Sequence, residues 1–156
     1  MRATSGFLGA LPPGHRSRLR AMAREAAFPV DFRIFEEGGR ADRFWVVRTG
    51  SVTLELRPPG HRLSSLRPAS VESVGPGELL GCSWLFPPYL WRLGARAASP
   101  VRALEFDARA VRALCEEDHV LGHAIVLAVT EVITGRLHTA RTRLLDSRGP
   151  QNQAPR

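Results

Sequence analysis

Short apolar segments, each broken by glycine or proline, fill the chain between residues 28 and 107. Val52, Leu54 and Leu56 alternate with polar or charged residues, which is the period of a strand with one buried face. Turn signals recur about every 8 to 12 residues, a spacing typical of all-β sandwiches and barrels. The predicted strands lie within residues 28–38, 43–57, 66–77 and 99–107. The loops between them include residues 36–39 and 57–61.

Helical periodicity precedes this β region. Residues 14–27 follow Pro12 and Pro13, and their apolar positions are spaced by three and four, which predicts a short amphipathic helix. We expect residues 7–11, which are mostly apolar, to pack as a small anchor ahead of that helix.

Helical periodicity returns after Asp107. Residues 108–118 predict a short helix, and Asp118 is the predicted N-cap of a long helix over residues 119–146. That long helix has two apolar stripes. The first is Leu121, Ile125, Ala128, Val132 and Gly135, and the second is Val126, Val129, Ile133, Leu137, Ala140 and Leu144. Two stripes predict that one face packs on the barrel and the other on a second copy, giving a homodimer; one wide intramolecular face is the alternative.

Composition narrows the class of protein. The chain has 156 residues, enough for one domain, and its net charge of +7 comes from 22 basic residues that are all arginine. These arginines are scattered, so a small acidic ligand or an anionic partner is compatible with them and duplex DNA is not favoured. We find no uninterrupted apolar run of about 20 residues and no signal-peptide pattern. We therefore expect a cytoplasmic protein without a membrane segment.

Cysteine and histidine usage argues against a metal or a catalytic centre. Cys82 and Cys115 are 33 residues apart in the sequence, outside any metal-ligand spacing, and we expect free thiols. His119 and His123 stand four apart on a predicted helix but lack an evident third ligand. The clustered histidines of a metal-dependent cupin enzyme are missing, as are nucleophile-elbow, P-loop and Rossmann motifs. The sequence therefore predicts no catalytic residues, no metal and no enzyme.

Residues 34–52, IFEEGGRADRFWVVRTGSV, carry a recognisable signature. They resemble the cyclic-nucleotide-binding domain, the sensor module of the catabolite-activator and fumarate-nitrate-regulator family. The resemblance covers residues 7–146 and implies a mainly β fold with flanking helices: a double-stranded β-helix (jelly-roll) barrel with an N-terminal helix and a long C-terminal helix. Residues 147–156 are polar and proline-rich, and we expect a disordered tail.

The segment over residues 75–97 is similar to the family's phosphate-binding cassette. The family opens the cassette with Gly-Glu, whose carboxylate accepts the ribose 2′-hydroxyl, and closes it with an arginine that pairs with the cyclic phosphate. Here Gly81 keeps the glycine, but Cys82 replaces the glutamate and Trp91 replaces the arginine, with Arg92 one place on. The candidate ligand-binding residues are Gly81, Cys82, Ser83, Trp84, Tyr89, Trp91, Arg92 and Arg96.

The resemblance implies a stand-alone sensor or regulatory domain with a variant cassette, acting through a partner protein. Its implied ligand is a cyclic nucleotide, and no other cofactor is expected. Only ten residues follow Asp146, so we expect no DNA-recognition helix and no direct DNA binding. The alternative is a ligand-free interaction module in which Trp84 and Trp91 fill the pocket.

Overall fold

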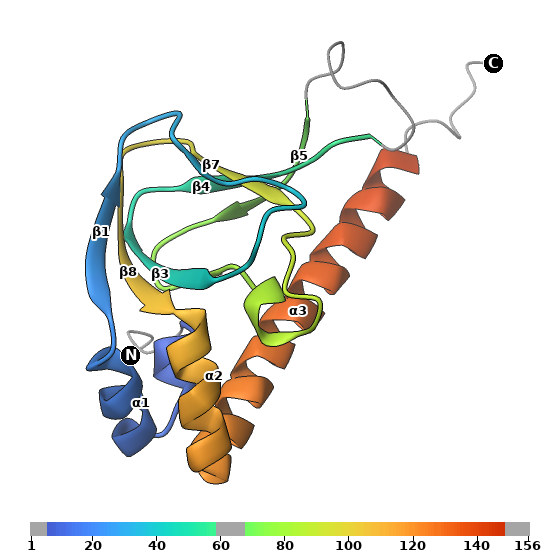
Figure 1. The fold of residues 1–156 in the computed structure, drawn as a ribbon. Helices are drawn as coiled ribbons and strands as arrows, with labels where there is room; N and C mark the ends of the chain where they lie inside the picture. Colours follow the sequence, from blue (N-terminus) through green and yellow to red (C-terminus); the bar gives the residue numbers. More distant parts are fainter. Residues whose placement is uncertain (1–5, 59–67, 149–156) are drawn as a thin grey trace, which may run out of the picture.

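In the part of the chain that the structure describes, two antiparallel four-stranded sheets form a roll, and three α-helices lie at one end and along one side of it (Figure 1). The computed structural model describes residues 6–58 and 68–148. The strands are β1 Arg24–Phe28, β2 Arg33–Phe35, β3 Arg43–Thr49, β4 Val52–Leu56, β5 Ala69–Val74, β6 Leu79–Leu80, β7 Gly94–Ala97 and β8 Val101–Asp107. The mainly β jelly-roll predicted from the sequence is confirmed.

Strand order places sequence-distant segments side by side. One sheet has the order β1-β8-β3-β6 and the other β2-β7-β4-β5. Phe44 of β3 lies opposite Phe106 of β8, and Leu54 of β4 lies opposite Ala95 of β7. All four side chains are buried, so the core lies between the two sheets and extends to the helices.

The N-terminal helix is shorter than the sequence predicts. Helix α1 spans Pro13–Arg20, and the predicted helical residues 24–27 belong instead to strand β1. Strand β1 pairs with β8 along its whole length, so a neighbouring strand supplies its backbone hydrogen bonds. Such tertiary pairing overrides a local helical pattern. The apolar anchor is confirmed: Phe7 and Leu11 are buried on either side of the 3₁₀ turn η1 (Leu8–Ala10).

Two capped helices follow β8. Helix α2 spans Ala108–Glu117, and Asp107 accepts a hydrogen bond from the Ala110 backbone N–H. Helix α3 spans His119–Arg148, and the Asp118 carboxylate accepts a hydrogen bond of 3.1 Å from the Leu121 N–H. The predicted cap is therefore confirmed. The helix continues to Arg148, while residues 149–156 and most of the predicted loop over residues 57–61 lie outside the described residues.

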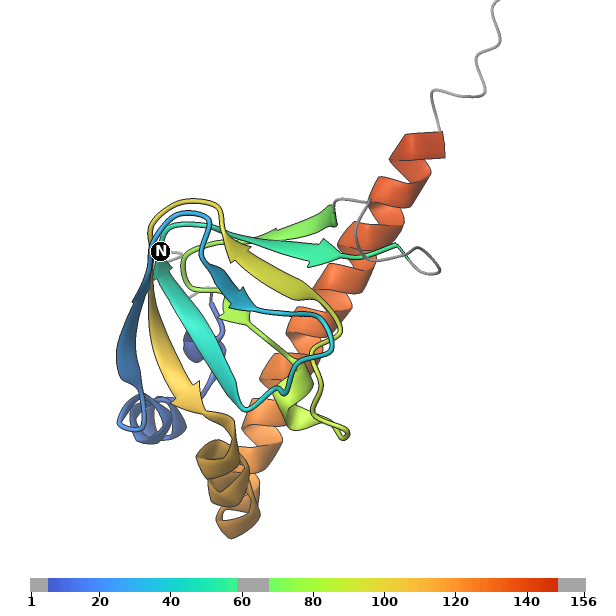
Figure 2. The same ribbon diagram turned by 45° about the horizontal axis from the view of Figure 1, so that its top comes forward.

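Helix α3 packs on the core with its first half, and its second half runs beside the roll and ends beyond it (Figure 2). Its buried residues are Leu121, Ile125, Ala128 and Val129. Its large exposed apolar residues are Val120, Val126, Leu127, Ile133, Leu137, Leu144 and Leu145. Most of the second predicted stripe is therefore exposed, except that Val129 belongs to the core.

Helix α3 is also long and apolar enough, by length and composition alone, to cross a membrane. Its mean hydropathy reaches 1.5 within residues 119–147, although isolated arginines interrupt the apolar residues. These interruptions explain why the sequence shows no continuous apolar run. A helix that packs on the core of a soluble protein passes the same test, so the absence of a membrane segment stays a prediction.

Candidate functional site

The segment predicted to be the cassette connects β6 to β7. Gly81 begins it with φ of +100°, in the left-handed region that favours glycine. The 3₁₀ turn η2 (Ser83–Leu85) follows, and then the Pro87–Pro88 turn. Tyr89 ends that turn with φ of +57°, and its carbonyl accepts a hydrogen bond from the Ala41 N–H.

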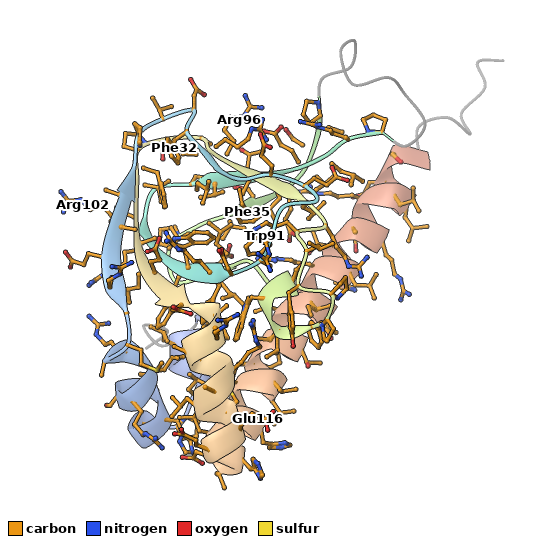
Figure 3. The ribbon with its side chains drawn as sticks, viewed as in Figure 1. Phe32, Phe35, Trp91, Arg96, Arg102 and Glu116 are labelled. Carbon is orange, nitrogen blue, oxygen red and sulfur yellow. The ribbon has the colours of Figure 1, made fainter. Side chains whose placement is uncertain are left out.

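Trp91 lies inside the roll beside the start of the cassette. Its ring stacks on Phe35 with centroids 3.9 Å apart (Figure 3). The ring centroid of Trp45 lies 6.3 Å from that of Trp91. Atoms of the Trp91 ring would come within 2.7 Å of a Cβ built on Gly81. Only 5% of Trp91 is exposed. The residue that the sequence resemblance aligns with the family's phosphate-binding arginine therefore fills interior space with an apolar ring.

Trp84 is a core residue. Its ring stacks on Phe44 with centroids 4.0 Å apart, and Phe44 stacks in turn on Phe106 at 4.7 Å. The indole N–H donates a hydrogen bond of 3.1 Å to the Gly81 carbonyl. The apolar ring is thereby buried against other rings, and its one polar group has a hydrogen-bond partner within the protein.

Tyr89 faces helix α2. The Arg112 guanidinium lies 4.1 Å from the Tyr89 ring centroid, and the same guanidinium donates a hydrogen bond of 2.6 Å to the Trp84 carbonyl. Arg112 thus fixes both ends of the aromatic part of the cassette to α2. No feature of the sequence pointed to this role for Arg112.

The two arginines at the end of the cassette have different surroundings. Arg92 is exposed and forms no ion pair with the described residues. Arg96 lies between the buried Ala95 and Ala97 on β7, so its side chain leaves the opposite face of the sheet. There Arg96 Nε donates to Glu55 Oε1 at 2.7 Å, and Arg33 lies 4.0 Å from the other oxygen of that carboxylate. Arg96 is therefore held by β4, away from Gly81.

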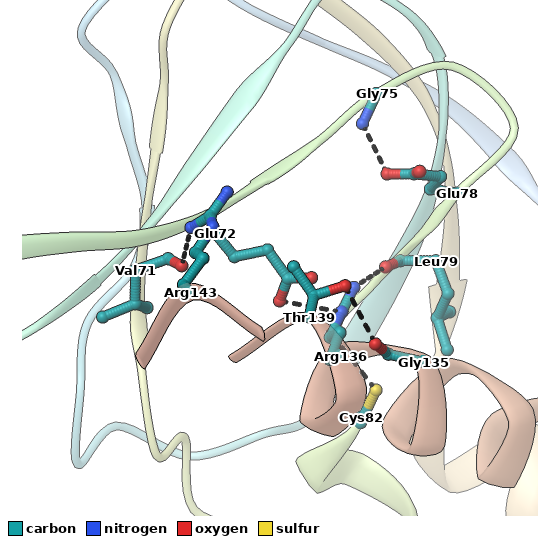
Figure 4. Close-up of polar contacts among 10 residues, drawn as sticks. All are labelled: Val71, Glu72, Gly75, Glu78, Leu79, Cys82, Gly135, Arg136, Thr139 and Arg143. Atoms are coloured by element: carbon teal, nitrogen blue, oxygen red, sulfur yellow. Dashed lines mark hydrogen bonds and ion pairs between the residues drawn. The ribbon is translucent and has the colours of Figure 1, made fainter. Parts of the chain in front are cut away.

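Cys82 contacts helix α3. Arg136 donates hydrogen bonds to the Cys82 sulfur, at 3.4 Å, and to the Leu79 carbonyl, and its Nε lies 3.4 Å from the Glu72 carboxylate (Figure 4). Burial raises the pKa of the Cys82 thiol, and the Arg136 charge opposes that rise. The thiol therefore stays neutral at pH 7 and is a weak substitute for a carboxylate acceptor. Ser83, the next residue, is half-buried.

Burial also raises the pKa of Glu72, against the opposing charge of Arg136. Sequence reasoning missed the Arg136 contacts because they join residues more than fifty positions apart. Within residues 6–58 and 68–148, no three His, Cys, Asp or Glu side chains are arranged to hold a metal ion.

The family assignment follows from comparison with known proteins. A family model described as the cyclic nucleotide-binding domain matches residues 27–118. The chain belongs to this family.

The domain is similar to the CRP-like cAMP-activated global transcriptional regulator of Mycobacterium tuberculosis, with 24% identity over 144 residues. The match covers 92% of this chain but only 60% of that regulator's length.

Solved structures show the same fold. A Geobacter metallireducens protein described as a cyclic nucleotide-binding protein is 28% identical, with a TM-score of 0.70 covering 85% of this chain and 92% of that one. A cyclic nucleotide-binding domain from Methylobacillus flagellatus is 17% identical, with a TM-score of 0.77 covering 96% of this chain and 82% of that one.

The cyclic nucleotide-binding domain described here brings some of its eight candidate residues together and separates others. Gly81 and Trp91 are in contact, and Trp84 joins them through its hydrogen bond to the Gly81 carbonyl. Cys82 faces α3, Tyr89 faces α2, and Arg96 faces Glu55. Whether any of these residues contacts a ligand stays a prediction.

Proposed function

We propose that this domain is a cytoplasmic regulatory module that acts through contacts with other protein chains, and that its own aromatic side chains close its cyclic-nucleotide site. The contact between Trp91 and Gly81 carries the proposal. A purine or its phosphate in the roll beside Gly81 would have to displace a ring that is stacked on Phe35. Removing a large buried aromatic ring from its contacts costs several kcal/mol, about 3–5 for truncation to alanine.

The polar groups around the cassette support a closed site. A bound cyclic nucleotide needs a cation for its phosphate and an acceptor for its ribose hydroxyl. Arg96 is engaged by Glu55, and the neutral Cys82 thiol is engaged by Arg136. A regulatory role is supported by the similarity to a transcriptional regulator.

The partner surface that we propose is the exposed stripe of α3, and the partner is a second copy of this chain. Val126, Ile133, Leu137 and Leu144 are exposed and spaced by seven, four and seven residues. This is the a/d spacing of a two-stranded coiled coil. A homodimer would bury these side chains, while the first half of α3 stays packed on the roll.

The test is a thermal-shift titration with cyclic AMP, cyclic GMP and cyclic dinucleotides at millimolar concentration. A ligand at 100 times its dissociation constant would stabilise the fold by about 2.7 kcal/mol, a readily measured shift. We expect no shift for the natural chain. A reproducible shift would overturn the closed-site proposal.

A ligand-responsive sensor is the second candidate. The exposed Arg92, one place from Trp91, favours it, because a small change in register would bring a guanidinium to the cassette. If a cyclic nucleotide does bind, Arg92→Ala should weaken binding more than Arg96→Ala. The reverse order would show that Arg96 leaves Glu55 to reach the ligand.

A further inference from the structure

A cleft lies on the outside of the roll, beside the Pro87–Pro88 turn. Three segments form its walls: residues 40–43 leading into β3, the turn residues Pro88 and Tyr89, and the first turns of α2. Its volume is about 480 Å³, within the range of small-molecule sites.

Backbone hydrogen bonds fix these three walls relative to one another. The Ala41 N–H donates to the Tyr89 carbonyl at 2.7 Å, and the Ala108 N–H donates to the Asp42 carbonyl at 3.0 Å. Arg40 also forms an isolated β-bridge with Leu90. The cleft is therefore preformed, which lowers the entropic cost of binding a ligand.

Arginine dominates the polar lining of the cleft. The charged lining residues are four arginines and two aspartates: Arg40, Arg43, Arg109, Arg112, Asp42 and Asp107. One of the two aspartates already has a hydrogen-bond donor, because the Asp107 carboxylate caps α2 by accepting a hydrogen bond from the Ala110 N–H. The cleft is therefore net positive by two formal charges, four minus two.

The four arginines divide into two kinds. Arg112 and Arg43 are the first kind, because each is held by other residues of the protein. Arg112 donates a hydrogen bond to the Trp84 carbonyl and lies over the Tyr89 ring, and Arg43 forms an ion pair with Glu105 at 3.6 Å. Arg40 and Arg109 line the cleft, and neither forms an ion pair with residues 6–58 or 68–148. These two guanidiniums come from different walls and leave their donors available to a ligand between them.

We propose that this cleft binds a small organic phosphate carrying a di- or triphosphate group, with Arg40 and Arg109 as the phosphate-contacting residues. Guanidinium groups match phosphate oxygens with paired, charge-assisted hydrogen bonds. A single inorganic phosphate would leave most of the volume empty, whereas a nucleoside polyphosphate is of the right size. This site goes beyond the proposed regulatory function, and it is separate from the roll interior at Gly81 and Trp91.

Isothermal titration calorimetry of the full chain with ATP and with inorganic tripolyphosphate tests the proposal. The variant Arg40→Gln/Arg109→Gln removes both free guanidiniums. The control Arg20→Gln/Arg102→Gln removes the same charge from exposed positions outside the cleft. We expect ATP to bind the natural chain, the cleft variant to lose affinity by about tenfold or more, and the control to change it by less than about twofold.

Two outcomes would overturn the proposal. The first is absence of measurable heat with both probes on a natural chain whose melting curve is cooperative. The second is equal loss of affinity in the cleft variant and the control, which would mean that ATP responds to the diffuse positive charge of the surface. Binding of ATP in preference to tripolyphosphate, lost only in the cleft variant, would support recognition of the nucleoside as well.

Discussion

The Trp91 ring lies against the α-carbon of Gly81, so a Cβ on Gly81 would come within 2.7 Å of that ring. The two residues come from opposite ends of the cassette, and each constrains the other. Trp91 can stack on Phe35 because residue 81 has no side chain, and residue 81 keeps φ of +100° because it is glycine. Contacts within the protein thus fill the space between these two residues.

Gly81→Ala should be strongly destabilising. The new methyl group meets a buried ring, and it makes the existing left-handed backbone conformation of residue 81 unfavourable; the two effects together cost roughly 2–4 kcal/mol. When Gly81→Ala is made in the Trp91→Leu variant, the steric part of this destabilisation disappears and the part due to the backbone conformation remains. We therefore expect a coupling of about 1–2 kcal/mol in a double-mutant cycle measured by urea unfolding.

Gly14→Ala is the matched control, because Gly14 lies in α1, has no positive φ, and would place an added Cβ in open space with no atom within 4 Å. Alanine there should be neutral or stabilise by up to about 1 kcal/mol. Additive effects of Gly81→Ala and Trp91→Leu would contradict the contact.

Arg96→Ala should destabilise the fold far more than Arg92→Ala. Glu55 is only 2% exposed, and loss of Arg96 leaves its charge with Arg33 at 4.0 Å as the remaining cation. Because the Arg96 side chain is 42% exposed, we expect Arg96→Ala to lower the free energy of unfolding by about 2–3 kcal/mol, which is less than the full cost of breaking a buried ion pair. Arg92→Ala should stay within about 0.5 kcal/mol. Equal urea unfolding midpoints for Arg96→Ala and Arg92→Ala would show that the buried Glu55 carboxylate does not need Arg96.

The sequence predicts the β-rich fold well because its signals are local. The sequence locates strand β4 from the alternating residues at Val52–Leu56, but burial stops alternating at the register shift after Leu54, where Glu55 is buried and Leu56 is exposed. It fails for residues 24–27, because strand β8, about 80 positions away, determines their conformation. The sequence singled out the aromatic residues of this segment as candidates but did not predict their directions, since a residue's register in a strand decides which face it occupies.

Asp118 should contribute to stability in a pH-dependent way. The hydrogen bond from the Leu121 N–H, followed by the charge of Arg18, lowers the pKa of Asp118 below its ordinary 3.8. A lowered pKa means that the stabilisation is present above pH 3.8 and is lost as the pH falls through the folded-state pKa. Asp118→Ala should lower the melting temperature at pH 7, whereas Asp118→Asn should keep most of the stabilisation that the cap provides.

The informative comparison for this cap is the difference in melting temperature between Asp118→Ala and the natural chain across the acidic range. That difference should shrink below pH 3.8 as the natural carboxylate becomes protonated. A difference that stays constant through this range would contradict a role for the charged cap.

Leu137→Glu should convert a dimer into a monomer. Leu137 is exposed at the middle of the α3 stripe, where a second copy would bury it in a seam intolerant of charge. Analytical ultracentrifugation measures the effect. Val120→Glu is the control, because Val120 is exposed on the same helix but outside the a/d spacing. A natural chain that sediments as a monomer would contradict this use of the stripe.

Cys82 should react slowly with iodoacetamide, because burial raises its pKa above the ordinary 9.0 and only the thiolate is nucleophilic. Arg136→Ala has two opposing effects: it removes a cation that lowers this pKa, and it uncovers the sulfur. Burial is the larger influence on Cys82, so uncovering should prevail and alkylation should become faster. Cys115, whose pKa burial also raises, lies apart from the Arg136 contacts and serves as the internal control in peptide mapping. Slower alkylation of Cys82 in Arg136→Ala would mean that the guanidinium activates the thiol more than it shields it.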